Sequence, residues 1–213
     1  MSYITLKQRA QATIIEKKSR FVADVCPVCT EKEAQDFIAS IRAQDRTATH
    51  NVYAYRLREN NLSRFTDAGE PSGTAGMPVL NVLERGGITD AVIVVTRWFG
   101  GTLLGTGGLV RAYGGAAKLG VEASGLVQMV LAGRYAFRCS YADYEKVLRL
   151  AADCGVEVKE TVFEADVYME FVAQSAPAQQ LDAALRELTR GQGSLTLLQT
   201  GYLPMDFSAE EKE

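Results

Sequence analysis

Apolar and polar positions along the first 130 residues predict a sheet of short strands. Residues 12–15 and 20–25 are strand-like runs on either side of the polar tetrad 16–19, so they predict a hairpin. Residues 52–57 alternate in the manner of a half-buried strand. Residues 88–96 are rich in β-branched side chains, which is typical of a buried central strand.

Three helices are predicted in the same part of the chain. Thr30 and Glu33 have the spacing of a capping box, and the apolar residues that follow recur every three or four positions, so this helix lays one face on a sheet. The polar region 58–70 is expected to be a loop, followed by a helix over 72–84. A third helix is expected over 107–123, although each glycine in it weakens a helix by about 1 kcal/mol relative to alanine.

The second part of the chain follows the order β-α-β-β-α-β, which is that of ferredoxin-like domains. Its predicted elements, in chain order, are 131–139, 141–153, 156–163, 167–172, 178–190 and 195–200. We therefore predict an α+β protein with a first domain at 1–130, a ferredoxin-like domain at 131–205 and a charged tail at 206–213.

Charge and glycine are distributed unevenly between the two predicted domains. Residues 1–130 carry 15 Lys and Arg against 12 Asp and Glu, a net +3, whereas residues 131–213 carry 8 against 14, a net −6. Of the 19 glycines, 14 lie between Gly69 and Gly125. The asymmetry favours different partners for the two domains, with any phosphate-bearing partner at the first.

Composition excludes several classes of protein. The opening residues lack the apolar segment of a secretory signal peptide, and no apolar run approaches the roughly 20 residues of a membrane-spanning helix. We expect a cytoplasmic protein with no membrane contact, and hence free thiols. Cys26 and Cys29 form a C-x-x-C pair, which we interpret as small apolar residues; a redox pair or half of a zinc site is the alternative.

Two segments differ from ordinary packing sequence. The first is FTDAGEPSGTAGMP at 65–78, and the second is VTRWFGGTLLGTGGLVRAY at 95–113. Together, and in this order, they closely resemble the motif pair of the IMPACT family, and the resemblance extends over the whole chain.

The resemblance implies a fold for each domain. The first domain would be an α/β sandwich like the second domain of small-subunit ribosomal protein five, and the second would resemble domain V of elongation factor G. Eukaryotic members act in translational control. The resemblance implies no reaction for bacterial members, and only suggests nucleic-acid binding.

The glycine-rich segment predicts an anion site, because a loop that enters a helix presents backbone N–H groups and the positive end of the helix dipole. The side chains and glycines expected to bind phosphate or nucleic acid are Lys17, Lys18, Arg20, Arg97, Gly100, Gly101, Gly105, Gly107, Gly108 and Arg111. The aromatic residues expected to stack on bases are Trp98, Phe99 and Tyr113. A tight turn with core-filling aromatics is the structural alternative.

The acidic loop of the first motif contains Asp67, Gly69 and Glu70. We interpret it as a turn before a helix, with a cation site or an acid–base pair as the alternative. His50 is the only histidine, and we interpret it as a hydrogen-bonded residue rather than a catalytic one. No cofactor, metal or catalytic residue is expected.

Three functions fit these observations. The favoured one is a non-catalytic protein of translational control that binds RNA or the ribosome, with no sequence-specific DNA contact. The second is an enzyme that binds a phosphorylated metabolite at the glycine-rich loop. The third is a protein-interaction module that uses exposed aromatic residues.

Overall fold

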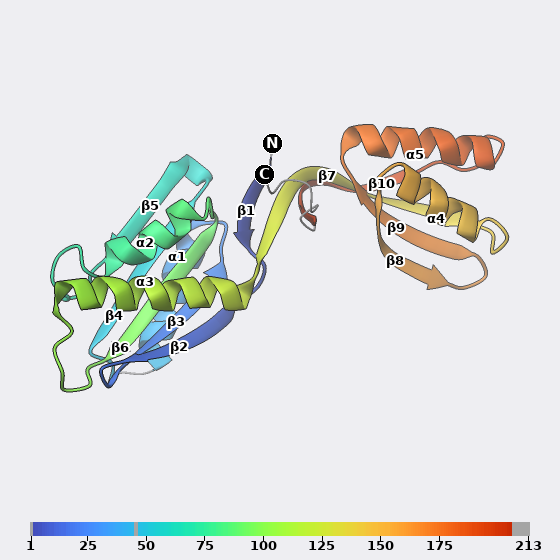
Figure 1. Cartoon of the computed structure of the whole chain (residues 1–213). Helices are drawn as coiled ribbons and strands as arrows, with labels where there is room; N and C mark the ends of the chain where they lie inside the picture. Colours follow the sequence, from blue (N-terminus) through green and yellow to red (C-terminus); the bar gives the residue numbers. More distant parts are fainter. Residues whose placement is uncertain (1, 45–46, 206–213) are drawn as a thin grey trace. The chain divides into compact units, whose positions relative to one another are not determined.

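The computed structural model describes residues 2–44 and 47–205, and its secondary structure is that of an α+β protein (Figure 1). These residues fall into two compact units. We call Tyr3–Gln128 the N-terminal unit and Met129–Met205, with Ser2, the C-terminal unit. The predicted tail at 206–213 lies outside the described residues.

The N-terminal unit is built on a five-stranded antiparallel sheet with the order β2-β3-β6-β4-β5. Its elements are β1 (Ser2–Leu6), β2 (Ala10–Glu16), β3 (Ser19–Pro27), α1 (Glu31–Gln44), β4 (His50–Leu57), the 3-10 helix η1 (Glu59–Asn61), β5 (Leu62–Thr66), α2 (Gly76–Arg85), β6 (Ala91–Trp98) and α3 (Gly105–Ser124). β7 (Leu126–Cys139) then runs into the C-terminal unit.

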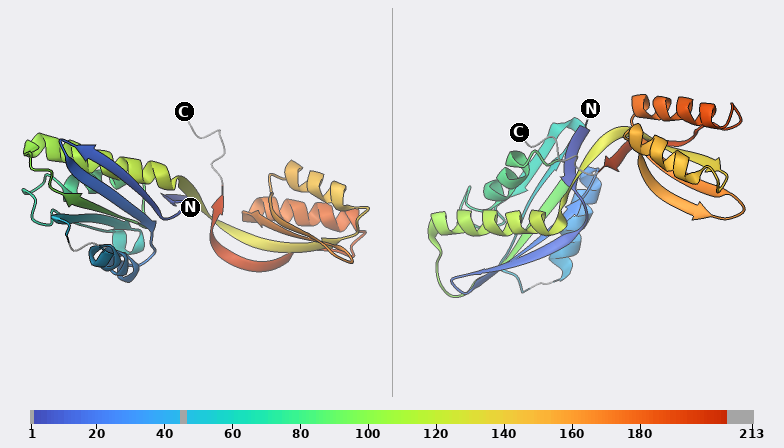
Figure 2. Two further views of the ribbon diagram at one scale, coloured as in Figure 1. Left: turned by 90° about the horizontal axis from the view of Figure 1, so that it is seen from below. Right: turned by 45° about the vertical axis from the view of Figure 1, so that its right-hand side comes forward.

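Helices cover both faces of this sheet (Figure 2), and the central strand β6 contributes side chains to the core on each face. Ile93 and Val95 pack in the core under α2 and α3, whereas Val92 and Val94 pack in the core under α1. This alternation follows from the two-residue period of a strand. Val25 of β3 meets Gly120, where a Cβ would lie only 2.7 Å from the valine side chain, so α3 sits very close to the sheet.

The C-terminal unit has the predicted β-α-β-β-α-β order. After β7 come α4 (Tyr144–Asp153), β8 (Glu157–Phe163), β9 (Val167–Ala173), α5 (Ser175–Leu188) and β10 (Thr196–Met205). β9 lies between β7 and β8, and β10 pairs with β7, which is the split βαβ arrangement of a ferredoxin-like domain. Apolar residues of α4 and α5 share one core with β7 and β9.

Several predicted boundaries are wrong. The turn of the first hairpin is two residues long rather than four, since Glu16 pairs with Ser19. The region 58–70, predicted as a loop, contains η1 and the edge strand β5. The second helix starts at Gly76 rather than at 72, and the third at Gly105 rather than at 107. β1 was not predicted.

Candidate functional site

The tip of the β2–β3 hairpin carries two lysines in an unusual backbone conformation. Lys17 has φ 43° and Lys18 has φ 69°, and both residues are exposed. Positive φ at both positions is the geometry of a type I′ turn, which glycine and asparagine adopt most easily. For other L-residues the left-handed conformation costs about 1–2 kcal/mol each. The two charges are therefore presented to solvent at the expense of strain.

An arginine–tryptophan stack joins the same hairpin to β6. Arg20 pairs with Trp98 across β3 and β6, and its guanidinium carbon is 3.8 Å from the centroid of the indole ring. Trp98 Nε1 donates to Thr47 Oγ1 at 3.3 Å. A polar groove of about 240 Å³ runs beside this stack, and Gln11 and Thr13 of β2 belong to its walls. Ile41 and Gln44 of α1 form another part of its wall.

Asp67 organises the loop between β5 and α2. Its carboxylate accepts backbone N–H bonds from Gly73 at 2.9 Å, Ala75 at 3.0 Å and Gly76 at 2.8 Å. Partial burial raises the pKa of Asp67, but these three bonds outweigh that effect and hold it below its ordinary value. One ionised side chain therefore fixes the loop, in agreement with the interpretation of this segment as a turn before a helix.

Glu70 is the centre of a buried cluster that joins the two motifs. Its Oε1 accepts a hydrogen bond from Arg97 Nη1 at 2.6 Å and one from the Tyr113 hydroxyl at 2.7 Å. His50 Nε2 lies 3.8 Å from the same oxygen. His50 Nδ1 lies 2.9 Å from the Ala68 carbonyl oxygen, which can only accept, so Nδ1 is the protonated nitrogen. Glycine at position 69 has φ +88° and lies against this imidazole.

The cluster buries two of the predicted binding residues, Arg97 and Tyr113. Arg97 is 5% exposed and is paired with Glu70, so it cannot reach the backbone of a nucleic acid. Tyr113 is fully buried, with its ring edge against Phe21, so it cannot stack on a base. Burial, followed by the bond to Glu70, raises the pKa of Tyr113. Ser19, which the sequence did not single out, is also buried here and accepts from Gly100 N at 3.1 Å.

The glycine-rich segment is less open than predicted. A Cβ on Gly100 would lie 2.0 Å from the carbonyl carbon of Lys18, so this glycine permits close contact between two backbones. Its N–H is used by Ser19, and the N–H of Phe99 is used by Thr49 Oγ1 at 3.1 Å. The loop thus does not form a cradle of unpaired N–H groups along its whole length, contrary to the prediction.

The remaining glycines lie at or near the start of α3. Gly101 has φ +80° and is exposed, and Gly105 is the first residue of the helix. Gly107 and Gly108 belong to the first turns of the helix rather than to the loop. The exposed Arg111 reaches back towards the helix start, since its Nη1 would lie 3.5 Å from a Cβ on Gly107.

A cavity of about 430 Å³ opens where the two motifs meet. Its walls contain His50, Glu70 and Arg97 of the cluster. The other lining residues are Thr49, Pro71, Phe99, Leu103, Leu104, Gly105, Thr106 and Leu109. Leu103 and Thr106 lie in the second motif, 95–113, but were not among the predicted site residues.

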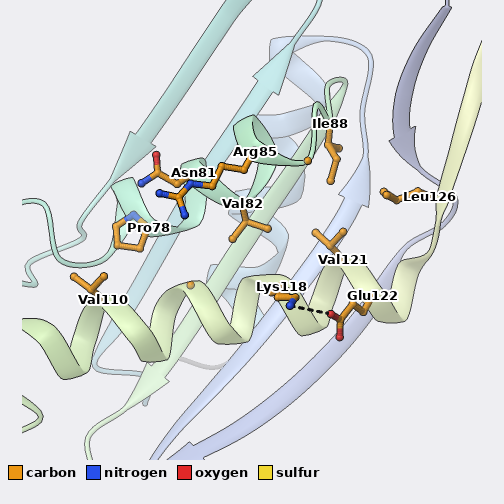
Figure 3. A pocket seen from close by; sticks show the side chains of 12 residues that line it. Pro78, Asn81, Val82, Arg85, Ile88, Val110, Lys118, Val121, Glu122 and Leu126 are labelled. Carbon is orange, nitrogen blue, oxygen red and sulfur yellow. Dashed lines mark ion pairs between the residues drawn. The ribbon is translucent and has the colours of Figure 1, made fainter. Parts of the chain in front are cut away.

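A second, more apolar groove of about 540 Å³ separates α2 from α3 in the same unit, and Figure 3 shows its walls. Val82, Val110 and Val121 line it, with Lys118 and Glu122 at one side. The two charged side chains form an ion pair at 3.8 Å. Gly114 of α3 also lines this groove.

The surroundings of the cysteine pair disfavour its thiolates. Cys26 and Cys29 are free, and burial raises the pKa of each thiol above its ordinary value. A redox-active cysteine requires a lowered pKa. Within residues 2–44 and 47–205, no group of three or more metal-ligating side chains comes together. No helix among those residues is long and apolar enough to cross a membrane.

The fold and the site define a two-domain α+β protein with a basic hairpin and a buried ionic cluster in its first unit. A family model described as the Impact N-terminal domain matches residues 17–121, and one described as Domain of unknown function (DUF1949) matches 137–192. The chain belongs to the IMPACT family.

Two bacterial relatives match along most of their length. The chain is 37% identical to IMPACT family member YvyE of Bacillus subtilis, over 95% of this chain and 94% of the relative. It is 32% identical to IMPACT family member YigZ of Escherichia coli, over 89% and 94%. A solved structure described as that of an hypothetical protein is similar with a TM-score of 0.59 and 28% identity, over 93% of this chain and 98% of that one.

Proposed function

We propose that this protein binds RNA, free or within a ribosomal particle, and that it acts in translational control without catalysing a reaction. The resemblance of the motif pair to a family with members in translational control supports the process. The exposed β2–β3 hairpin supports the mode of binding.

The observation that carries the proposal is the pair of lysines at the hairpin tip. A two-residue turn of this type favours Asn-Gly, so the sequence Lys17-Lys18 is a poor choice for folding. Backbone strain held by non-glycine residues is typical of functional positions. Two adjacent exposed ammonium groups suit contacts with phosphates, which provide most of the affinity of RNA-binding proteins.

The Arg20–Trp98 stack extends this basic surface along the sheet. Trp98 has one ring face under the Arg20 guanidinium, and an aromatic ring beside a cation is a platform on which an unpaired base stacks. Single-stranded RNA is recognised in this way, by stacking together with backbone contacts. The polar groove beside the stack offers hydrogen-bonding groups on the same face.

The test uses a variant that removes both charges and improves the turn. Lys17→Asn with Lys18→Gly places the favoured type I′ residues at the tip, so the hairpin should become at least as stable. Binding to ribosomal subunits or to a single-stranded RNA should weaken. The slope of log K against log salt should fall by about 1 for each lost phosphate contact.

The matched control removes two lysines elsewhere in the same unit. Lys32 and Lys118 are exposed on α1 and α3, so the double change to alanine alters the net charge equally. It should leave the salt slope unchanged. The proposal is wrong if the parent protein shows no salt-sensitive binding to RNA or ribosomal particles, or if the Asn-Gly variant binds as the parent does.

A further inference from the structure

The cavity beside the buried cluster lies on the other face of the sheet from the basic hairpin surface. Arg97, in its wall, lies between Thr96 and Trp98 on β6, and neighbouring residues of a strand point to opposite faces. A ligand in the cavity would therefore use different side chains from those proposed to bind RNA. Its volume of about 430 Å³ falls within the range of small-molecule sites.

The polar end of the cavity contains the Arg97 guanidinium, which is permanently charged. Glu70 and Arg97 are both in its wall, but the carboxylate is already matched by the guanidinium through Nη1. Arg97 Nε is buried and has no hydrogen-bond partner among the described residues. Because this nitrogen is enclosed, a ligand in the cavity is attracted by the charge of the guanidinium and does not bond to Nε itself.

The start of α3 adds to this positive character. Gly105 and Thr106 line the cavity and are the first two residues of a 20-residue helix. Leu104 at the N-cap gives no side-chain cap, and no acidic residue lies in the first turn. The first N–H groups of a helix have no partner within the helix, and the dipole favours an anion there.

The opposite end of the cavity is apolar and open. Leu103 is 83% exposed and Phe99 is 47% exposed, although both are large apolar side chains. Leu104 and Leu109 form the buried part of the same wall. Exposed apolar side chains around a polar recess are typical of a site that holds a molecule with an apolar body.

We infer that this cavity binds a small organic oxyanion, a carboxylate or a phosphate monoester with an apolar body. The oxyanion lies at the start of α3 near Arg97, and the apolar body lies against Phe99, Leu103 and Leu109. The inference does not depend on RNA binding, since the two surfaces share no wall residue.

The test measures binding of four probes, benzoate, phenyl phosphate, inorganic phosphate and uncharged benzyl alcohol, by the amide NMR shifts of Gly105 and Thr106. Benzoate or phenyl phosphate should bind at least tenfold more tightly than both inorganic phosphate and benzyl alcohol. Which of the two charged aromatic probes binds more tightly distinguishes a carboxylate ligand from a phosphate ester. The inference is overturned if no charged probe shifts these amides or if benzyl alcohol binds equally well.

Two exposed positions provide variants that spare the fold. Thr106→Phe places a ring at the mouth of the cavity and should weaken binding of the preferred aromatic probe at least tenfold. Thr102→Phe, in the same loop but outside the cavity wall, should not. Leu103→Ala should weaken the aromatic probes and leave inorganic phosphate unchanged. If Thr106→Phe binds the probe as tightly as the parent does, the site is refuted. RNA binding of the same variant, measured separately, should equal that of the parent.

Discussion

Removing the guanidinium of Arg97 should show whether the buried pair with Glu70 supports the N-terminal unit. The two side chains are 6% and 4% exposed and their atoms lie 2.6 Å apart. Arg97→Met keeps the length of the side chain but leaves Glu70 as a buried charge with only the Tyr113 hydroxyl as a close donor. Breaking a buried pair from one side costs about 3–5 kcal/mol.

The companion variant is Glu70→Gln, which retains an acceptor for the Tyr113 hydroxyl. Alone it leaves the Arg97 charge buried beside a neutral amide and should also be destabilising. Combined with Arg97→Met it removes both charges, so the double variant should be more stable than the sum of the single effects predicts. The coupling energy should be about 2–3 kcal/mol, the upper range for residues in direct contact.

The assay is urea unfolding followed by the fluorescence of Trp98. Trp98 is the only tryptophan and belongs to the N-terminal unit, so the signal reports on the unit that contains the pair. The control cycle uses Lys32 and Asp36, an exposed ion pair on α1, whose coupling should be close to zero. The reasoning fails if Arg97→Met costs no more stability than Lys32→Met.

Three further predictions concern residues around the cluster. Asp67→Asn should destabilise the unit at neutral pH. Because the folded-state pKa of Asp67 is lowered, the stability that its carboxylate contributes is present above the ordinary Asp pKa and is lost as pH falls through the folded-state pKa. The melting curves of variant and parent should therefore converge in acid. Gly107→Ala should raise the stability by about 0.5–1 kcal/mol, since Gly107 is a helical residue with room for a Cβ. Gly100→Ala should be clearly destabilising, because its Cβ would overlap the backbone of Lys18, and equal melting temperatures for the two alanine variants would contradict this account.

The sequence predicted the structure well where it shows a clear apolar periodicity or a helix-capping motif. The capping box is present, with Thr30 Oγ1 accepting from Glu33 N at 3.2 Å. The element order of the C-terminal unit is confirmed. It could be predicted because α4 and α5 have clear apolar faces. β5 was missed because it is an edge strand in which no residue is fully buried, so its pattern resembles that of a loop.

The site was predicted less well for a physical reason. β6 is covered on both faces, and its buried residues run from Ala91 to Arg97 without a polar alternation. A sequence of this kind does not show to which face Arg97 points. The start of α2 was misplaced because Pro71 and Ser72 resemble a helix start. In the structure the carboxylate of Asp67 instead accepts from the N–H groups of Gly73, Ala75 and Gly76 and holds them in a turn.

The alternation along β6 also limits how this protein can change during evolution. Trp98 belongs to the hairpin surface and Arg97 to the cavity, so a single inserted or deleted residue upstream in the strand would exchange their faces. Both surfaces would then be lost in one event. Changes of length are tolerated far more readily in exposed loops that carry no site. Substitutions can alter either surface separately. A change in the length of β6, in contrast, would affect the hairpin surface and the cavity together.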